Sequence, residues 1–438
     1  MIQGITEQDI EKAESTNKDV ENANSSRKPK MNMLIHIGAE SPKFQRKGEG
    51  SCSIFKIPQS LKKNHQKGYE PEIVSIGPYD HGKEHLQMLE EHKHRYLKLF
   101  LGEAKDGVDT NTLGRKILQM ETAIRNSYSE KLVVIKPEFL KMMLLDGCFI
   151  LMLSHQNDRI LTTPWILSTI RSDLLLLENQ VPLILLNTLL KESNISKNVN
   201  LETLAFKFFN LSVAEKTKSQ NFEAEHLLDL IRKNFINGTS QSPEKAPSNS
   251  HYDDSRLILS ANRLRLQGIK FKASTNVPRR SSREETILDI KLNGNELHIY
   301  SVLLNCVAFE QLSTKCFNNI ASYVVFMGCL MNDEADATYL SEKGIIQNYV
   351  GNGSDVSQFF KFICKDVAFD MSNSYLKEEF EGINNYTSNR WNVECARFKN
   401  LHFDSPWTVL SSFAVLAAIL LSILQTIFGG LSYLHHCK

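Results

Sequence analysis

The chain has 438 residues, of which 42% are hydrophobic and 23% are charged, proportions that suit a globular protein with one large domain or two modest ones. Its 51 basic and 50 acidic side chains leave a formal net charge of +1. This balance excludes a global electrostatic field that would attract nucleic acid, so we expect no nucleic-acid partner.

The eight cysteines indicate a reducing compartment. None forms a C-x-x-C pair, and most lie inside apolar runs, where a thiol behaves as a small hydrophobic group. The N-terminus shows no apolar region of the kind found in signal peptides, so we expect no signal peptide. Residues 1–50 lack apolar periodicity and are rich in Glu, Lys, Asn and Ser, which predicts a disordered tail.

Two short extended segments are predicted where order begins. Residues 54–58 end in a proline, and residues 69–76 precede the turn signal Gly77-Pro78. Both segments are expected to be strand-like.

Three helices are predicted next, over residues 86–101, 111–128 and 137–153. The first is amphipathic, and its predicted polar face carries five charged residues: Glu90, Glu91, Lys93, Arg95 and Lys98. The third is almost wholly apolar, but it is too short to span a bilayer and contains Asp146. It is therefore predicted to be a core helix.

The apolar segment 166–190 allows two interpretations. It is long enough for a membrane span, but Arg171, Asp173 and Glu178 would each cost about 2.5–3.5 kcal/mol near a bilayer centre. Pro182 would also break or kink the helix. A buried, broken core helix is the favoured interpretation.

The second half of the chain is predicted to be mostly helical. The expected helices cover residues 201–211, 221–234, 260–267 (with Gly268 as its C-cap), 302–331, 355–369 and 376–403. Prolines and serines mark a polar linker over residues 237–255.

The strongest β signal is a predicted hairpin. Residues 287–292 and 296–300 alternate apolar and polar side chains around Asn293-Gly294, the preferred type I′ turn pair. Residues 269–271 also alternate. The expected fold class is therefore mainly α with a small antiparallel β-sheet (α+β), in a body spanning residues 51–405.

The C-terminal segment is the most informative part of the chain. Residues 409–428 contain no charged side chain, and twenty helical residues cover roughly 30 Å, the thickness of a bilayer's hydrocarbon core. Trp407 and Tyr433 flank this run, as expected of aromatic groups at a membrane interface. We predict a single transmembrane anchor over residues 406–430, with a short tail over 431–438.

A buried C-terminal helix of a soluble protein is the alternative. Polar residues interrupt the apolar run: Ser411, Ser412, Ser422, Gln425 and Thr426. Serine and threonine can bond to the carbonyl four residues earlier, however, so they cost little in lipid.

Charges around the span predict its orientation. Arg390, Arg397 and Lys399 precede it, whereas Lys438 is the fixed cation that follows. The positive-inside rule therefore keeps the large body in the cytosol, on a plasma membrane or an endomembrane.

Four histidines form the best candidate metal site. His81 and His85 are four residues apart, a spacing that places two imidazoles on one helical face in zinc sites. Gly82 follows His81, however, so a helix would only begin there, and no third ligand is suitably spaced. His92 and His94 would point to opposite sides of a helix. Surface or half-buried histidines are the simpler explanation, and we expect neither metal nor another cofactor.

A second candidate site consists of polar side chains within the apolar segment 166–190: Asp173, Glu178, Asn179 and Gln180. A buried carboxylate there could have a raised pKa and act as a general acid or base. The favoured alternative is that these side chains satisfy backbone groups freed by Pro182 and pin neighbouring segments together. The same two explanations apply to Glu310 and Gln311.

Residues 277–285 are predicted to be a basic, serine-rich loop in which basic residues precede serines, as in a kinase target. Phosphate added there could pair with the arginines. A solvated loop is the commoner explanation. The chain has no Walker loop, no G-x-S-x-G, no H-E-x-x-H and no C-x-x-C. We therefore expect no catalytic residue from a known motif.

Several motifs together resemble the plant family known as domain of unknown function 247. They are IFKIP (54–58), YEPEIVSIGPYDHG (69–82), MLLDGCFIL (143–151), DLLLLENQVP (173–182), HLLDL (226–230), LRLQGIKFK (264–272), NCVAFEQ (305–311), YVVFM (323–327) and PWTVLS (406–411). The resemblance covers nearly the whole ordered chain. It departs at Asp80-His81, where the family usually has a histidine pair.

The resemblance implies a helical, C-terminally anchored plant protein without an established reaction, and it assigns no catalytic residue. Some grass members of that family are implicated in self-incompatibility, which implies recognition. We therefore predict a membrane-tethered module that binds an unknown protein partner. The alternatives are a self-incompatibility determinant and an enzyme with an unusual site around Glu178 or the His81/His85 pair.

Overall fold

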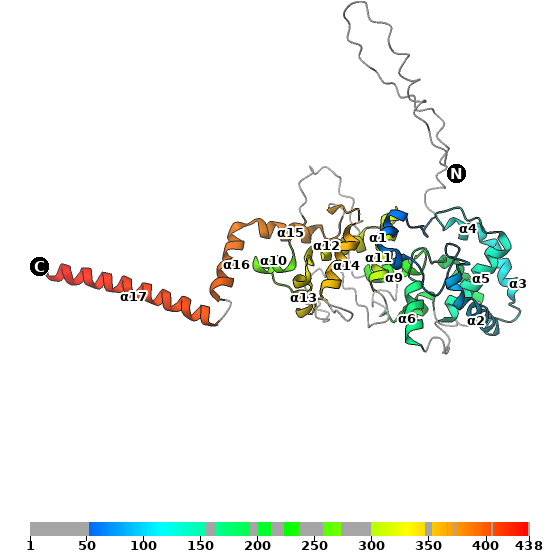
Figure 1. Cartoon of the computed structure of the whole chain (residues 1–438), viewed down its shortest axis with the longest axis horizontal. Coiled ribbons are helices and arrows are strands. Elements are labelled where there is room, and N and C mark those ends of the chain that lie inside the picture. The colour runs from blue at the N-terminus through cyan, green and yellow to red at the C-terminus, as the bar shows by residue number, and fades with distance from the viewer. Residues whose placement is uncertain are drawn as a thin grey trace, which may run out of the picture. The chain divides into compact units, whose positions relative to one another are not determined.

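The computed structural model describes residues 52–153, 163–192, 200–211, 223–236, 257–272, 299–346, 353–365, 367–371, 374–403 and 406–436. Helices dominate these residues (Figure 1). They are α1 (Gln59–Tyr69), the 3₁₀ helix η2 (Glu84–Leu89), α2 (Glu90–Gly102), α3 (Thr110–Gln119), α4 (Glu121–Asn126), α5 (Lys136–Leu153), α6 (Pro164–Asp173), α7 (Leu183–Glu192), α8 (Leu201–Phe208), α9 (Leu227–Ile236), α10 (Ala261–Leu266), α11 (Ile299–Leu312), α12 (Asn319–Leu330), α13 (Glu334–Glu342), α14 (Gly353–Lys365), α15 (Lys377–Ser388), α16 (Arg390–Phe403) and α17 (Pro406–His436).

The predicted antiparallel sheet is wrong for the part of the chain that the structure describes, which contains no β-strand. An isolated parallel bridge between Ile54 and Tyr128 is the nearest approach to one. Residues 70–76 and 269–272 have no regular structure, and Tyr300, expected in the hairpin, lies in α11. Most of the hairpin, residues 287–298, lies outside the described residues.

The extended segments satisfy their backbone without strand partners. Their backbone amides, which a sheet would pair with carbonyls, donate instead to buried carboxylate and amide side chains. The amides of Ile57 and Ile73, for example, donate to Glu178 and Asp173. The fold is therefore mainly α.

Helix α5 lies at the centre of the first half of the body and confirms the predicted core helix. It packs against α2, α3 and α7, and its residues from Met142 onward are buried. Gly147 allows the close approach of α7, because a Cβ there would lie 2.3 Å from Cδ1 of Leu189.

The apolar segment 166–190 is a buried, broken helix, as favoured above. Helix α6 ends at Asp173, residues 174–182 form a connection that contains two turns, and α7 begins directly after Pro182. Leu174 to Leu177 are all buried in that connection. The connection therefore brings polar and apolar side chains into the core together.

Helices α9, α11, α12 and α14 pack together in the second half of the body. Helix α13, which adjoins α14 and α10, was not expected from the sequence. It begins at an N-cap in which Asp333 accepts the amide of Asp336 (2.9 Å). The predicted tail (1–50), linker (237–255) and basic loop (277–285) lie outside the described residues.

Candidate functional site

The four histidines do not share one continuous helix, since His92 and His94 lie in α2. His81 lies in a turn and His85 in η2, so no continuous helix carries both. Gly82 between them has a φ of +81°, which interrupts helical backbone. His81 Nε2 lies 4.0 Å from Glu138 Oε1. Among the residues that the structure describes, no group of three His, Cys, Asp or Glu side chains could hold a metal ion.

Asp173 fixes a segment without regular secondary structure, residues 70–80, which we call the strap. Its carboxylate accepts hydrogen bonds from three consecutive strap amides, those of Glu72 (3.0 Å), Ile73 (2.9 Å) and Val74 (3.0 Å). Burial raises the pKa of Asp173 to about 6, and the three N–H groups oppose that rise. The carboxylate replaces a neighbouring strand as the acceptor for these amides.

Glu178 fixes the segment before the strap. Its carboxylate accepts the amide of Ile57 (2.6 Å) and pairs with the ammonium of Lys62 on α1 (2.6 Å). The Glu178 side chain is only 2% exposed. A buried carboxylate that is both ion-paired and hydrogen-bonded stabilises the fold at this point.

Asn179 bonds to the strap in both directions. Its Oδ1 accepts the amide of Ile76 (2.6 Å), and its Nδ2 donates to the carbonyls of Val74 (3.0 Å) and Asp173 (2.9 Å). This side chain therefore pairs with the backbone as a strand would.

Gln180 closes the turn that follows α6. Its Nε2 donates to the carbonyls of Leu174 (2.7 Å) and Leu176 (2.9 Å), and its Oε1 accepts the amide of Leu228 at the start of α9 (3.3 Å). These bonds satisfy backbone groups that the broken helix leaves open.

Lys93 was predicted on the polar face of α2, and this is wrong because its side chain is 1% exposed. Its Nζ lies 2.7 Å from Asp146 Oδ1, 2.6 Å from Glu90 Oε1 and 2.5 Å from the carbonyl oxygen of Ser75. Asp146 Oδ2 in turn accepts the amide of Gly77 (2.8 Å). Burial opposes the charge on Lys93, but the two carboxylates outweigh it and raise the pKa of Lys93.

A second buried ion cluster links α9 to α11 and α12. Arg232 donates to Asp229 Oδ1 (3.1 Å) and to Glu310 Oε1 (3.0 Å). Glu310 also accepts the amides of Ile320 (3.1 Å) and Ala321 (2.9 Å) at the start of α12. Burial raises the pKa of Glu310 to about 7, while Arg232 and both amides oppose the rise. No local pattern around Arg232 distinguishes it from other arginines in the chain.

His226 is a buried titratable group that was not among the candidate site residues predicted from the sequence. Its Nδ1 accepts the amide of Asp229 (3.2 Å), so its Nε2 carries the proton and donates to the carbonyl of Ser53 (3.1 Å). The ring packs edge-on against Phe309, with the centroids 4.8 Å apart. Burial lowers the pKa of His226 to about 4. The neutral imidazole is therefore the form that fits this site.

The pH dependence of stability should report this neutral histidine. Between the folded pKa of about 4 and the ordinary value of 6.5, the unfolded chain binds a proton at His226 that the native chain excludes. The contribution of His226 to the free energy of unfolding should therefore rise with pH across this window, by about 3 kcal/mol.

Urea unfolding of the full chain and of His226→Gln in neutral detergent, repeated at several pH values, isolates this contribution. The difference in unfolding free energy between the two proteins should widen as the pH rises from 4 to 6.5. Two pH profiles that run parallel would show that His226 does not titrate in this way.

The polar residues singled out from the sequence therefore act as partners of backbone groups. Gln311 also does so, because its Oε1 accepts the amide of Ala368 (2.9 Å). These contacts match the structural explanation given above rather than an acid–base site. Asp173, Glu178 and Glu310 line neither the pocket around Tyr339 nor the small cavity around Leu204.

The described cysteines form no disulfide with one another. A nucleophilic cysteine needs a lowered pKa, which favours the thiolate. Burial instead raises the pKa of Cys148 and Cys306, and it raises that of Cys364 to about 12. These three side chains pack as small hydrophobic groups.

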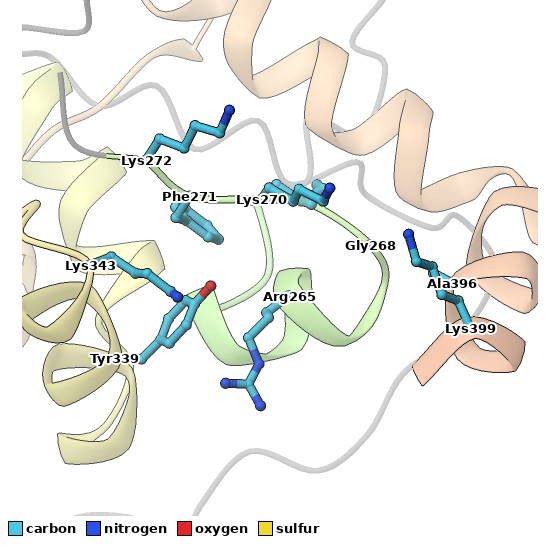
Figure 2. Close-up of a pocket in the computed structure, with 10 residues that line it drawn as sticks. Arg265, Gly268, Lys270, Phe271, Lys272, Tyr339, Lys343, Ala396 and Lys399 are labelled. Carbon is cyan, nitrogen blue, oxygen red and sulfur yellow. The ribbon is translucent and has the colours of Figure 1, made fainter. Parts of the chain in front are cut away.

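A pocket of about 590 Å³ is lined by residues from α10, the segment after it, α13 and α16, and we call it the basic pocket. Five cationic side chains line it: Arg265, Lys270, Lys272, Lys343 and Lys399. Figure 2 shows the segment from Gly268 to Lys272 running between Tyr339 and Lys343 on one side and Ala396 and Lys399 on the other. No acidic side chain is among the described residues that line it.

Aromatic stacking orders one wall of the basic pocket. The guanidinium of Arg265 lies 5.0 Å from the centroid of the Tyr339 ring, and the ammonium of Lys343 lies 5.6 Å from it. Phe271 packs edge-on against the same ring, with the centroids 6.0 Å apart. Tyr339 therefore positions two cations beside each other through its π face.

Gly268 shapes the floor of the pocket and confirms the predicted C-cap of α10. Its φ is +97°, its amide donates to the carbonyl of Arg265 (3.0 Å), and the amide of Ile269 donates to that of Leu264 (3.0 Å). These bonds form a Schellman motif. A Cβ at Gly268 would lie 2.9 Å from that of Ala396, so the glycine also permits close contact with α16.

Helix α17 carries the apolar C-terminal segment. Residues Leu410–Gly429 have a mean hydropathy of 2.1 over twenty residues, and none of this span is buried against the rest of the described chain. The helix is continuous in Figure 1. It is therefore long and apolar enough to cross a membrane, and it is not a buried core helix of this chain. Thr426 Oγ1 donates to the carbonyl of Ser422 (2.7 Å), as expected for polar groups in such a helix.

Comparison with known proteins gives matches over most of the chain. The family DUF247, described as plant protein of unknown function, matches residues 54–423. The UPF0481 protein At3g47200 of Arabidopsis thaliana is 45% identical over 430 residues, which cover 89% of this chain and 89% of the relative. The putative UPF0481 protein At3g02645 of the same plant is 21% identical over 482 residues, which cover 86% of this chain and 90% of the relative. No solved structure gives a significant match.

Proposed function

The chain belongs to DUF247, a plant family of unknown function, and we propose that it is a membrane-tethered interaction module whose helical body binds another protein. In this proposal α17 is the anchor. The body is the part that recognises the partner, and tethering raises its local concentration near a partner in or on the same membrane.

The unburied apolar surface of α17 is the observation that carries the proposal. Large apolar side chains are about half exposed or more all around this helix: Leu410, Phe413, Val415, Leu416, Ile419, Leu420, Leu421, Ile423, Leu424, Ile427 and Phe428. Burying apolar surface is favourable by about 25 cal/mol per Å² removed from water, so a helix apolar on every side is unstable in water. A lipid bilayer covers all of its faces at once.

The state of the buried polar groups favours binding over catalysis. Asp173, Glu178 and Glu310 each accept backbone amides, and Glu178 and Glu310 also pair with cations. Using any of them as an acid or base would break contacts that hold the strap or join the helices. No contact of the described residues bears on the self-incompatibility alternative, which stays a prediction.

The orientation of the anchor is part of the proposal. Arg390, Arg397 and Lys399 lie on α16, just before α17, and the positive-inside rule keeps that side in the cytosol. The body would then face the cytosol, with only the short C-terminal tail translocated.

Glycosylation mapping tests both insertion and orientation. An acceptor sequence appended after Lys438 should be glycosylated when the full chain is expressed in plant cells, because the tail would be luminal. The chain's own acceptor sequence Asn210-Leu211-Ser212 should stay unmodified. The matched control carries the same appended acceptor on a chain with Leu420→Arg, in which translocation should fall because a central arginine costs about 2.5–3.5 kcal/mol. Glycosylation at Asn210 would reverse the proposed orientation, and an unmodified tail would remove support for insertion.

A further inference from the structure

We propose that the basic pocket binds a phosphate-bearing anion, and that its source is the headgroup of an anionic phospholipid in the membrane that holds α17. The shared chemistry is a phosphomonoester, as on a phosphorylated headgroup, which carries about −1.5 to −2 charge at pH 7. The binding itself does not depend on the proposed anchor, whereas the lipid source does.

The basic pocket concentrates positive charge. Arg265, Lys270, Lys272, Lys343 and Lys399 converge on one cavity, and none of them pairs with a carboxylate among the residues described. All five are exposed to solvent. Elsewhere in the described chain, surface lysines such as Lys116 and Lys377 do have acidic partners. Like charges gathered without a counter-charge repel one another, and a bound anion relieves that repulsion.

Contacts within the wall of the basic pocket hold two of its cations in place. Tyr339 holds Arg265 and Lys343 against its ring, and the Schellman motif at Gly268 fixes the backbone that carries Lys270. Two of the cations are therefore partly preorganised, which lowers the entropy lost when they bind an anion. A guanidinium beside an ammonium offers both a planar fork and a point charge to phosphate oxygens.

The size of the basic pocket suits a small phosphorylated group. A volume of about 590 Å³ falls within the roughly 300–1,000 Å³ range of small-molecule sites. It can hold a phosphorylated headgroup, and it is larger than a single phosphate needs. An extended nucleic acid is disfavoured, because the ring faces of Tyr339 and Phe271 are engaged within the wall and do not form a stacking platform.

The position of the pocket in the chain indicates the lipid source. Lys399 lies about one turn before the end of α16 at Phe403, and α17 begins at Pro406. The pocket is therefore built partly on the element that leads into the proposed anchor. Basic residues near an anionic membrane surface gain about 1 kcal/mol each, so a pocket close to that surface would meet headgroups at high local concentration.

The test uses the full chain in neutral detergent and two probes. One probe is soluble inositol trisphosphate, and the other is phosphatidylinositol phosphate doped into the micelles, with phosphatidylcholine as the reference lipid. Calorimetry should show saturable binding of the inositol lipid and none of phosphatidylcholine. Binding of the lipid that is tighter than binding of the soluble probe assigns the site to a membrane headgroup, whereas equal or tighter binding of inositol trisphosphate assigns it to a soluble phosphorylated molecule.

The variants keep the result specific to the pocket. Lys343→Gln combined with Lys399→Gln should weaken binding by about tenfold or more, since each removes a charge-assisted contact. Lys361→Gln is the matched control, because Lys361 is also exposed but lies on α14 outside the pocket, and it should leave the affinity nearly unchanged. Circular dichroism on heating should show that all variants fold alike.

Equal or tighter binding of inositol trisphosphate would overturn the lipid source, and three outcomes would overturn the anion site itself. They are the absence of binding to either probe, an equal loss of affinity in Lys361→Gln, and displacement of both probes by single-stranded RNA at lower concentration than by inositol trisphosphate. These measurements are made in detergent and do not test membrane insertion. A failure of the pocket to bind either probe would therefore leave the proposed anchoring by α17 untouched.

Discussion

Asp146→Asn is expected to lower the free energy of unfolding by about 3 kcal/mol, one of the largest effects of any conservative substitution in this chain. The substitution leaves the ammonium of Lys93 buried while removing the carboxylate 2.7 Å from it. Glu90 and the carbonyl of Ser75 remain as partners of Lys93, so the loss falls at the lower end of the range for breaking a buried pair.

A double-mutant cycle separates the ion pair from the loss of packing. Lys93→Met should cost a similar amount, because it leaves Asp146 buried with only the amide of Gly77 donating to it. The double variant should cost less than the sum of the two single variants by at least about 1 kcal/mol. Urea unfolding of the full chain in neutral detergent measures all three.

A surface pair provides the control for this cycle. Glu394 lies 3.2 Å from Arg397, and both side chains are more than 60% exposed. Glu394→Gln should change stability by less than about 0.5 kcal/mol. Additive losses at Lys93 and Asp146, or a cost as small as that of Glu394→Gln, would contradict the view that this pair fixes the strap to the core.

Gly77→Ala is expected to be as damaging, by about 3 kcal/mol or more, for a different reason. Gly77 has a φ of +74°, and a Cβ there would lie 2.6 Å from the backbone carbonyl oxygen of Gln180. The clash is with backbone in the buried turn after α6, so no flexible side chain can move aside. Tyr128 also donates to that same carbonyl (3.0 Å), which fixes it further.

Gly82→Ala is the matched control for this prediction. Gly82 has a similar φ of +81°, but a Cβ there would meet nothing within 4 Å. Its substitution should cost only the strain of a left-handed alanine, about 1–2 kcal/mol. Thermal unfolding of the two variants compares them directly, and equal losses would show that backbone strain rather than the clash at Gln180 decides the effect.

The periodicity of the sequence correctly indicated the helices that bury a continuous apolar face. The core helix α5, the break at Pro182 and the C-cap at Gly268 all follow from local signals, namely an apolar run, a missing amide and a residue free to adopt positive φ. The apolar length of α17 is also a local property. Such features need no knowledge of what the segment contacts.

The predictions failed where a segment's partner lies far away in the chain. The sequence predicted a strand-like segment over residues 69–76, but the acceptors of its backbone amides are side chains about one hundred residues later, at Asp173 and Asn179. Lys93 looked solvent-exposed because charge normally indicates the polar face. Its carboxylate partner, Asp146, lies on another helix that the periodicity of α2 cannot reveal.

The candidate sites also depend on features that local sequence patterns do not reveal. Spacing suggested a helical pair at His81 and His85, yet the positive φ of Gly82 separates them. The basic pocket draws its five cations from three separate parts of the chain, so no single motif could indicate it. The net charge of +1 conceals this local concentration of charge.

Extraction of plant membranes with alkaline carbonate tests the central claim, that α17 lies in lipid, most directly. The full chain should remain in the membrane pellet and dissolve only in detergent, while Leu420→Arg shifts part of it to the supernatant. A full-length chain that carbonate releases, and that then stays soluble without detergent, would contradict the claim.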